Sequence, residues 1–271
     1  MANPLLLHEN LLADSTGTLT ASSSASGFPV TNINDWRPGV SYRWKATATT
    51  DQTIDMDAGA GNTLAADTFC MAGHNFGTVA ARISIIADTF TPPTTIRKVG
   101  FTPTDDLPLL VTFTEQNLRY WRIFIDNTPS AVVQAGVMAL GRRIDYDAGA
   151  LMDLDPYNRS SKVEPFINNN GSPIGVNVRE QTKMFQMSYG EANGGMRTSS
   201  FYDTITPDIK TGWLPHAVDN AKPFFFAWNI DVDSDEIYLC RVQGPTVSLP
   251  FVGSTTRIGF RTTFIAHRET S

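Results

Sequence analysis

Residues 25–46 read ASGFPVTNINDWRPGVSYRWKA. A glycine and a proline near the start of this stretch signal a turn, and a short polar link follows. Three large rings then come close together, at Trp36, Tyr42 and Trp44. We interpret this stretch as a ring-rich link that closes one end of a β-sandwich, with some rings buried beneath it and others free to contact a partner.

The sequence around this link alternates between apolar and polar residues in short segments. In residues 53–59 (TIDMDAG), Ile54 and Met56 alternate with polar residues, the period of a half-buried strand. Two segments read instead as loops, the Ser/Thr-rich residues 15–26 and the proline-rich residues 91–108. The remaining segments predict seven or eight strands before residue 143, at sandwich-like spacing, and no helix there.

A change in amino-acid composition near residues 141–149 predicts a domain boundary. The stretch after it is rich in Asp and turn residues, and β patterns then resume. We therefore expect an all-β protein with a β-sandwich over residues 1–142 and a second β-rich domain, sandwich or barrel, over residues 143–271. A short helix is conceivable only around residues 201–210, where Pro207 limits its length.

Composition narrows the classes of function. The chain has 271 residues, a net charge of -6 and 18% charged residues, below the usual fraction of about 25%. A low fraction of charged residues is typical of a protein whose surface is covered by partners. It is equally typical of a β-rich chain that contains many Ser and Thr residues. No basic block occurs, which disfavours nucleic-acid binding.

The N-terminal residues and the two cysteines indicate the cellular compartment in which we expect the protein to fold. The N-terminal residues lack a basic leader, so we expect no signal peptide, and no apolar run is long enough for a membrane span. Cys70 and Cys240 each lie in a separate apolar, strand-like run. Two lone buried thiols favour a reducing compartment or assembly inside a cell, and the alternative is a single disulfide between them.

Several segments together resemble the galactose-binding-like (discoidin-type) β-sandwich family. They are GFPVTNINDW with YRWKA, then TIDMDAG, FCMAGHNFG, ISIIADTF and RYWRIFID, and they cover about residues 10–141. The resemblance implies a jelly-roll sandwich. It also implies that Asn32 and Asp35 form the link that defines the fold and that Trp44 is its buried ring.

The order of these segments, with AGHNFG after the second strand, is also similar to tail proteins of long-tailed bacteriophages. Residues 224–269, which begin FFFAWNIDVD, resemble the ending of minor tail or distal-tail-type proteins. This resemblance implies a structural virion protein of the tail tip or baseplate, assembled in the host cytoplasm. Its partners would be further copies of itself, in a ring or trimer, and other tail proteins.

Motifs for catalysis or metal binding are missing. The sequence contains no GxSxG, no HExxH and no phosphate-binding glycine loop, so we expect no enzyme, no catalytic residue and no cofactor. The acidic residues 231–236 do not meet the EF-hand spacing and read as a solvated turn. Discoidin-like folds often hold a structural Ca²⁺, but the sequence nominates no metal ligand.

Five residues are candidates for contact with a glycan or a protein partner: Trp36, Tyr42, His74, Asn75 and Trp213. Rings at loop tips stack on sugars and also anchor interfaces. The alternatives are a ring folded back over its own loop and a histidine satisfied within its turn. The leading hypothesis is a structural tail protein that assembles as an oligomer, with host attachment left open as a further role. The second hypothesis is a carbohydrate-binding module for host-surface glycans.

Overall fold

The computed structural model divides the chain into two compact units. It describes residues 5–14, 16–126, 130–145, 150–151, 159–168, 170, 172–189, 196–197, 213, 215–228, 236–243, 257–258 and 260–266. The N-terminal unit contains Asn3–Asp145 and Phe225–Ile237, and the C-terminal unit contains Tyr146–Phe224 and Tyr238–Thr270. The predicted boundary after residue 142 lies close to this division, which in addition gives Phe225–Ile237 to the N-terminal unit.

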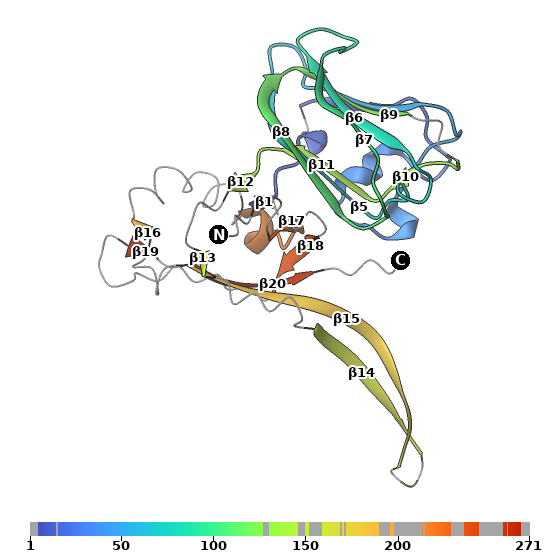
Figure 1. Ribbon diagram of the computed structural model, residues 1–271, viewed down its shortest axis with the longest axis vertical. Coiled ribbons are helices and arrows are strands. Elements are labelled where there is room, and N and C mark those ends of the chain that lie inside the picture. The colour runs from blue at the N-terminus through green and yellow to red at the C-terminus, as the bar shows by residue number, and fades with distance from the viewer. Residues whose placement is uncertain are drawn as a thin grey trace. The chain divides into compact units, whose positions relative to one another are not determined.

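Two antiparallel sheets form the sandwich of the N-terminal unit (Figure 1). One sheet has the strand order β2–β4–β9–β6–β7 and the other has the order β11–β5–β8. The bounds are β2 Thr18–Ala21, β4 Gln52–Asp57, β5 Leu64–Ala72, β6 Arg82–Asp88, β7 Ile96–Phe101, β8 Leu109–Leu118, β9 Tyr120–Asp126 and β11 Val137–Gly141. The all-β class and the expected N-terminal sandwich are confirmed.

Alternating side chains from both sheets build one apolar core. Ile54 and Met56 of β4 are 1% exposed, as their spacing predicts, and Phe69 of β5 is fully buried in the same cluster. Trp121 of β9 also lies in this core, and its indole Nε1 donates a hydrogen bond to the carbonyl of Leu64 at 3.2 Å. The buried rings therefore satisfy their polar atoms within the sandwich.

Two strands lie in segments expected to be loops. Strand β2 pairs with β4 within the Ser/Thr-rich residues 15–26, and β7 pairs with β6 within the proline-rich residues 91–108. Both are at the edge of the five-stranded sheet. The sequence prediction was wrong here because an edge strand buries little, so it needs no strong apolar alternation and tolerates flanking prolines.

Smaller elements complete the N-terminal unit. Strand β1 (Leu5–Leu7) pairs on one side with β12 (Ile144–Asp145) and on the other with residues 225–227 of β17 (Phe224–Ala227). A 3-10 turn, η1 (Leu11–Ala13), follows β1. Two further 3-10 turns, η2 (Val30–Asn34) and η3 (Val40–Tyr42), precede β3 (Trp44–Lys45), which pairs with β10 (Gln134–Ala135).

The C-terminal unit is organised around the long strand β15 (Pro173–Tyr189). It pairs with β14 (Arg159–Ile167), with β13 (Ala150–Leu151) and with β20 (Phe260–Ala266), and β20 also pairs with β18 (Ile237–Val242). Strands β16 (Met196–Arg197) and β19 (Arg257–Ile258) pair with each other, and Pro215–Asp219 form a π-helical turn. The helix considered at residues 201–210 and most of the acidic run at 231–236 lie outside the described residues. No helix in the described part of the chain has the length and apolar character to cross a membrane.

Candidate functional site: the loop from Asp35 to Arg43

The buried ring of Trp36 holds this loop in place. Its φ of 61° lies in the left-handed region, which is costly for a residue with a side chain. Its ring is only 7% exposed and packs against Phe225, with 6.0 Å between the ring centroids. The expectation of an exposed contact ring at Trp36 is therefore wrong. The covering ring arrives from the far end of the sequence, which no local pattern reveals.

Pro38 fixes the middle of the loop because two glycines admit it closely. A Cβ atom on Gly73 would lie 2.5 Å from the Pro38 carbonyl oxygen, and one on Gly136 would lie 2.6 Å from its Cα. The two glycines are joined by a hydrogen bond of 3.0 Å from Gly136 N to Gly73 O. Arg43 Nε donates to the Pro38 carbonyl at 3.1 Å. The backbone of Pro38 is thus held from three directions.

Polar side chains close the two ends of the loop. Asn32 Nδ2 donates to the carbonyl of Arg43 at 3.0 Å. Asp35 accepts hydrogen bonds from the backbone N–H and the Nε of Arg37, each at 2.9 Å. Trp44 is fully buried, and its Nε1 donates to the carbonyl of Ser23 at 3.0 Å. Asn32 and Trp44 therefore hold the two ends of the loop, and Asp35 braces Arg37 within it.

The tip of the loop carries exposed side chains, and the backbone beneath them is held by Trp36 and Pro38. The Tyr42 ring is 45% exposed and Val40 is 67% exposed. The Arg37 guanidinium lies over the Tyr42 ring, 4.0 Å from its centroid, and its side chain is 56% exposed. We call Arg37, Val40 and Tyr42 the Tyr42 platform. Of these three residues, only Tyr42 was predicted from the sequence to contact a partner. The Pro38-Gly39 turn between Arg37 and Tyr42 was the available signal that the two side chains meet.

His74 belongs to the scaffold. It is 3% exposed, with Nε2 2.8 Å from the Leu107 carbonyl and Nδ1 3.2 Å from the N–H of Phe76. Nε2 therefore donates and Nδ1 accepts, which defines a neutral tautomer. Burial lowers the pKa of His74 to about 4, although the bond to Leu107 and two nearby carboxylates oppose that shift. With both ring nitrogens occupied, His74 offers nothing to a ligand, contrary to the prediction.

Asn75 is likewise used internally. Its Nδ2 donates to the Val132 carbonyl at 2.9 Å, and its Oδ1 accepts from the N–H of Gln134 at 2.9 Å. Gly77 admits the next loop, since a Cβ there would lie 2.2 Å from the Asp105 carbonyl oxygen. The AGHNFG motif therefore joins three loops at one point, and its polar side chains bond to the backbone of the protein itself.

Trp213, nominated as a loop-tip ring, is fully buried in the C-terminal unit. Its ring meets Phe224 edge-on with centroids 5.6 Å apart, and Phe264 with centroids 6.0 Å apart. Aromatic pairs of this geometry contribute about 0.5–1.5 kcal/mol each beyond simple burial. Trp213 is therefore a core residue, and the prediction of an exposed ring is wrong here too.

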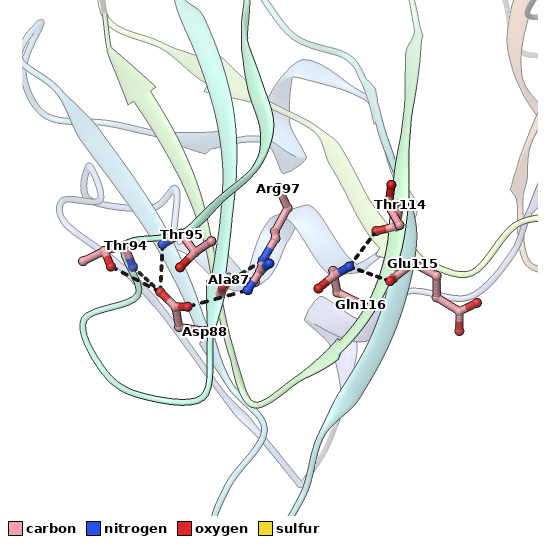
Figure 2. Close-up of polar contacts among 8 residues, drawn as sticks. All are labelled: Ala87, Asp88, Thr94, Thr95, Arg97, Thr114, Glu115 and Gln116. Carbon is pink, nitrogen blue, oxygen red and sulfur yellow. Dashed lines mark hydrogen bonds and ion pairs between the residues drawn. The ribbon is translucent and has the colours of Figure 1, made fainter.

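A second exposed surface lies on the β6–β7 hairpin. Asp88 at the end of β6 accepts a hydrogen bond from the N–H of Thr95 at 2.8 Å, and Arg97 lies 3.6 Å from its other oxygen. Figure 2 shows Asp88 among Thr94, Thr95 and Arg97, so that one carboxylate braces the whole turn. We call the apolar residues that this hairpin exposes the hairpin surface: Phe90 at 54%, Ile96 at 55% and Val99 at 76%.

Reactive groups are sparse in the part of the chain that the structure describes. Within it, no three His, Cys, Asp or Glu side chains gather closely enough to hold a metal ion. Cys70 and Cys240 are free and fully buried, and burial raises the pKa of each thiol well above its usual value. Neither thiol is therefore activated as a nucleophile.

Comparisons with known proteins find structures but no sequence family. No family model matches the chain, and neither does any curated protein sequence. Among solved structures, it is similar to a chitosan-binding module from Paenibacillus sp. IK-5 at 20% identity and a TM-score of 0.37, over 49% of this chain and 98% of that one. It is similar to a family 32 carbohydrate-binding module from Clostridium perfringens, in complex with galactose, at 13% identity and a TM-score of 0.40, over 52% of this chain and 99% of that one.

A third similar structure is a fucosidase from Ruminococcus gnavus, at 14% identity and a TM-score of 0.41. The match covers 50% of this chain and only 27% of the fucosidase. At these identities and scores the likenesses carry no argument about what the chain binds. Two of these three structures are carbohydrate-binding modules, and none of the three is a phage tail protein.

Proposed function

We propose that the N-terminal unit is a non-catalytic recognition module and that its Tyr42 platform binds glycans. The observation that supports this proposal is an exposed aromatic ring, Tyr42, on a loop whose anchors are buried. Trp36 and Pro38 hold the backbone on either side of Arg37. A loop fixed before binding loses little conformational entropy when a ligand arrives, so a small contact surface suffices for recognition.

The platform offers the two kinds of contact that a sugar needs. The Arg37 guanidinium covers one face of the Tyr42 ring, so a pyranose would pack its C–H face on the other. The Arg37 guanidinium has five N–H donors, of which the bonds to Asp35 use only a part. The remaining donors lie over the ring, and those at its edge can bind sugar hydroxyls. Because Asp35 balances the charge of Arg37, the platform suits neutral sugars.

The test compares two exposed rings. Wild-type protein, Tyr42→Ala and the control Phe90→Ala are screened on a glycan array, and each hit is measured by calorimetry. We expect Tyr42→Ala to weaken binding at least tenfold and Phe90→Ala to leave it unchanged, since Phe90 is as exposed but lies on the hairpin. An array without hits, or equal binding by Tyr42→Ala and wild type, would refute the proposal.

A second candidate is a structural role in a phage tail tip or baseplate. It is supported by the sequence resemblance and by the hairpin surface, which leaves Ile96 and Val99 exposed on the edge strand β7. Exposed apolar edges are normally covered in a finished assembly. The purified protein should then join tail-tip particles when mixed with tail proteins. A chain that stays monomeric at high concentration and does not join such particles would exclude this role, which is otherwise compatible with glycan binding.

A further inference from the structure

Strand β17 brings residues from the second half of the chain into the N-terminal unit. It pairs with β1, where Leu7 lies opposite Phe225 (Figure 1). The division of the chain falls within this strand, because Phe224 belongs to the C-terminal unit and residues 225–237 belong to the N-terminal unit. The N-terminal unit is therefore completed by a strand that follows most of the C-terminal unit in the sequence.

Neighbouring rings of β17 are buried in different units. Phe224 and Phe225 are both fully buried. Phe224 packs against Trp213 and Phe264 of the C-terminal unit, with ring centroids 5.6 and 5.0 Å apart. Phe225 packs instead against Trp36 of the N-terminal unit, with centroids 6.0 Å apart. This split follows from strand geometry, since successive side chains point to opposite sides of a strand.

The contact of Phe225 with Trp36 supports an unfavourable backbone conformation. Trp36 has a φ of 61°, and a residue with a side chain keeps such a φ only where surrounding contacts hold it. Its ring is 7% exposed, so burial of that ring against Phe225 offsets the backbone strain. If the ring lost this cover, the backbone of Trp36 would relax towards a negative φ, which a residue with a side chain prefers.

The backbone of Trp36 sets the direction in which Arg37 leaves it. The two residues are adjacent, so a change of φ at Trp36 turns the segment that carries Arg37. The Arg37 guanidinium lies 4.0 Å from the centroid of the Tyr42 ring, and the N–H of Tyr42 donates to the Gly39 carbonyl at 2.9 Å. The stacking of Arg37 on Tyr42 therefore depends on the conformation that Phe225 supports at Trp36.

We infer that Phe225 is a positioning residue of the Tyr42 platform, so that a strand from the second half of the chain determines whether Arg37 and Tyr42 are held in place. The platform is then complete only when β17 is paired with β1. The coupling is reciprocal, because a ligand that fixes Arg37 and Tyr42 must also stabilise the packing of Trp36 on Phe225. The effect on glycan binding rests on the proposed function, whereas the effect of Phe225 on the loop does not.

Hydrogen exchange in the full-length chain, followed by NMR, tests the positioning role without a ligand. Phe225→Leu and Phe225→Ala are compared with the matched controls Phe224→Leu and Phe224→Ala in the same strand. In Phe225→Ala, the N–H groups of Arg37 and Tyr42 should exchange about tenfold faster than in wild type. Phe225→Leu keeps most of the side-chain volume and should give a smaller increase. Both Phe224 variants should leave these two rates unchanged.

The N–H groups of β4 separate loosening of the loop from unfolding of the unit, because β4 lies in the same sandwich. They should keep their protection in the Phe225 variants. Equal losses of protection in the loop and in β4 would show that Phe225 is only structural and would overturn the inference. If an Ala variant does not fold, the Leu variants decide in the same way.

Calorimetry with the glycans that bind wild type forms a second arm. Phe225→Leu should weaken binding by about threefold, since a less fixed loop loses more entropy on binding, and Phe224→Leu should not. Wild-type exchange rates at Arg37 and Tyr42 in both Phe225 variants, or the same acceleration in the Phe224 variants, would overturn the inference whether or not a glycan is found. If the array gives no hits, the proposed function fails, and faster loop exchange in the Phe225 variants alone still supports the positioning role.

Discussion

The turn around His74 and the loop around Tyr42 are close in composition and opposite in organisation. Both follow a glycine or proline turn, and both combine rings with polar residues. In the turn, the polar atoms of His74 and Asn75 all bond inward. In the loop, the buried members hold Tyr42 and Arg37 out towards solvent. A ring in a polar loop is thus evidence for recognition only when other residues carry the structural role.

The largest expected effect separates the two rings of the loop itself. Trp36→Ala removes a buried ring from Phe225 and should lower the free energy of unfolding by about 3–5 kcal/mol. Tyr42→Ala removes an exposed ring and should change it by less than about 0.5 kcal/mol. Chemical denaturation measures both variants. Equal losses would show that Tyr42 is also structural and would remove the contrast between support and platform.

A glycine pair tests whether the loop depends on the turn below it. Gly73→Ala places a Cβ atom 2.5 Å from the Pro38 carbonyl at a φ of +67°, and should cost about 3 kcal/mol. Gly61→Ala is the matched control. It has a φ of +80° but nothing within 4 Å, so only the backbone strain of about 1 kcal/mol applies. Similar melting temperatures for the two variants would show that Pro38 is not clamped by Gly73.

The pH dependence of stability reports on the buried turn. The pKa of His74 is lowered by burial from 6.5 to about 4, so between these values the unfolded chain binds more protons than the folded one. Stability should therefore fall as the pH drops from 6.5 to 4, by at most about 2–3 kcal/mol. Denaturant titrations at several pH values measure this slope.

A His74→Gln variant separates this contribution from others. Burial also lowers the pKa of His216, so protonation of His216 in the unfolded chain lowers stability in the same direction. The pKa of Asp57 is lowered mainly by its bond to Arg119, so Asp57 changes the stability only near and below pH 3.8. The variant should lose most of the slope between pH 6.5 and 4. A slope that persists in full would assign the effect to other groups and leave His74 without a role in it.

The sequence predicts the core better than the loops, for a physical reason. Alternation at Ile54 and Met56 is local, because each strand of a sandwich must send alternate side chains to the core. The partners that decide between a buried and an exposed ring are distant. Trp36 is covered by Phe225, and His74 is satisfied by Leu107. No pattern within one loop contains that information, so Tyr42 could be nominated but not distinguished from Trp36.

The edge strands β2 and β7 were not predicted, for a related reason. Strand β7 leaves Ile96 and Val99 exposed, which breaks the expected relation between apolar character and burial. Its pairing with β6 depends on a turn braced by Asp88.

The smallest expected effect concerns the charge beneath the platform. Asp35→Asn keeps an oxygen that can accept from the Arg37 N–H at 2.9 Å but removes the ion pair with its guanidinium. An exposed pair of this kind contributes about 0–1 kcal/mol, so the free energy of unfolding should change by less than about 1 kcal/mol. Binding should respond differently from stability, because an unbalanced guanidinium over Tyr42 favours acidic over neutral sugars. Calorimetry with a neutral glycan and its carboxylated counterpart measures this preference, with Asp51→Asn as the control at an exposed site elsewhere. If Asp35→Asn changes neither the stability nor the preference, Arg37 is a bystander and the platform consists of the tyrosine ring alone.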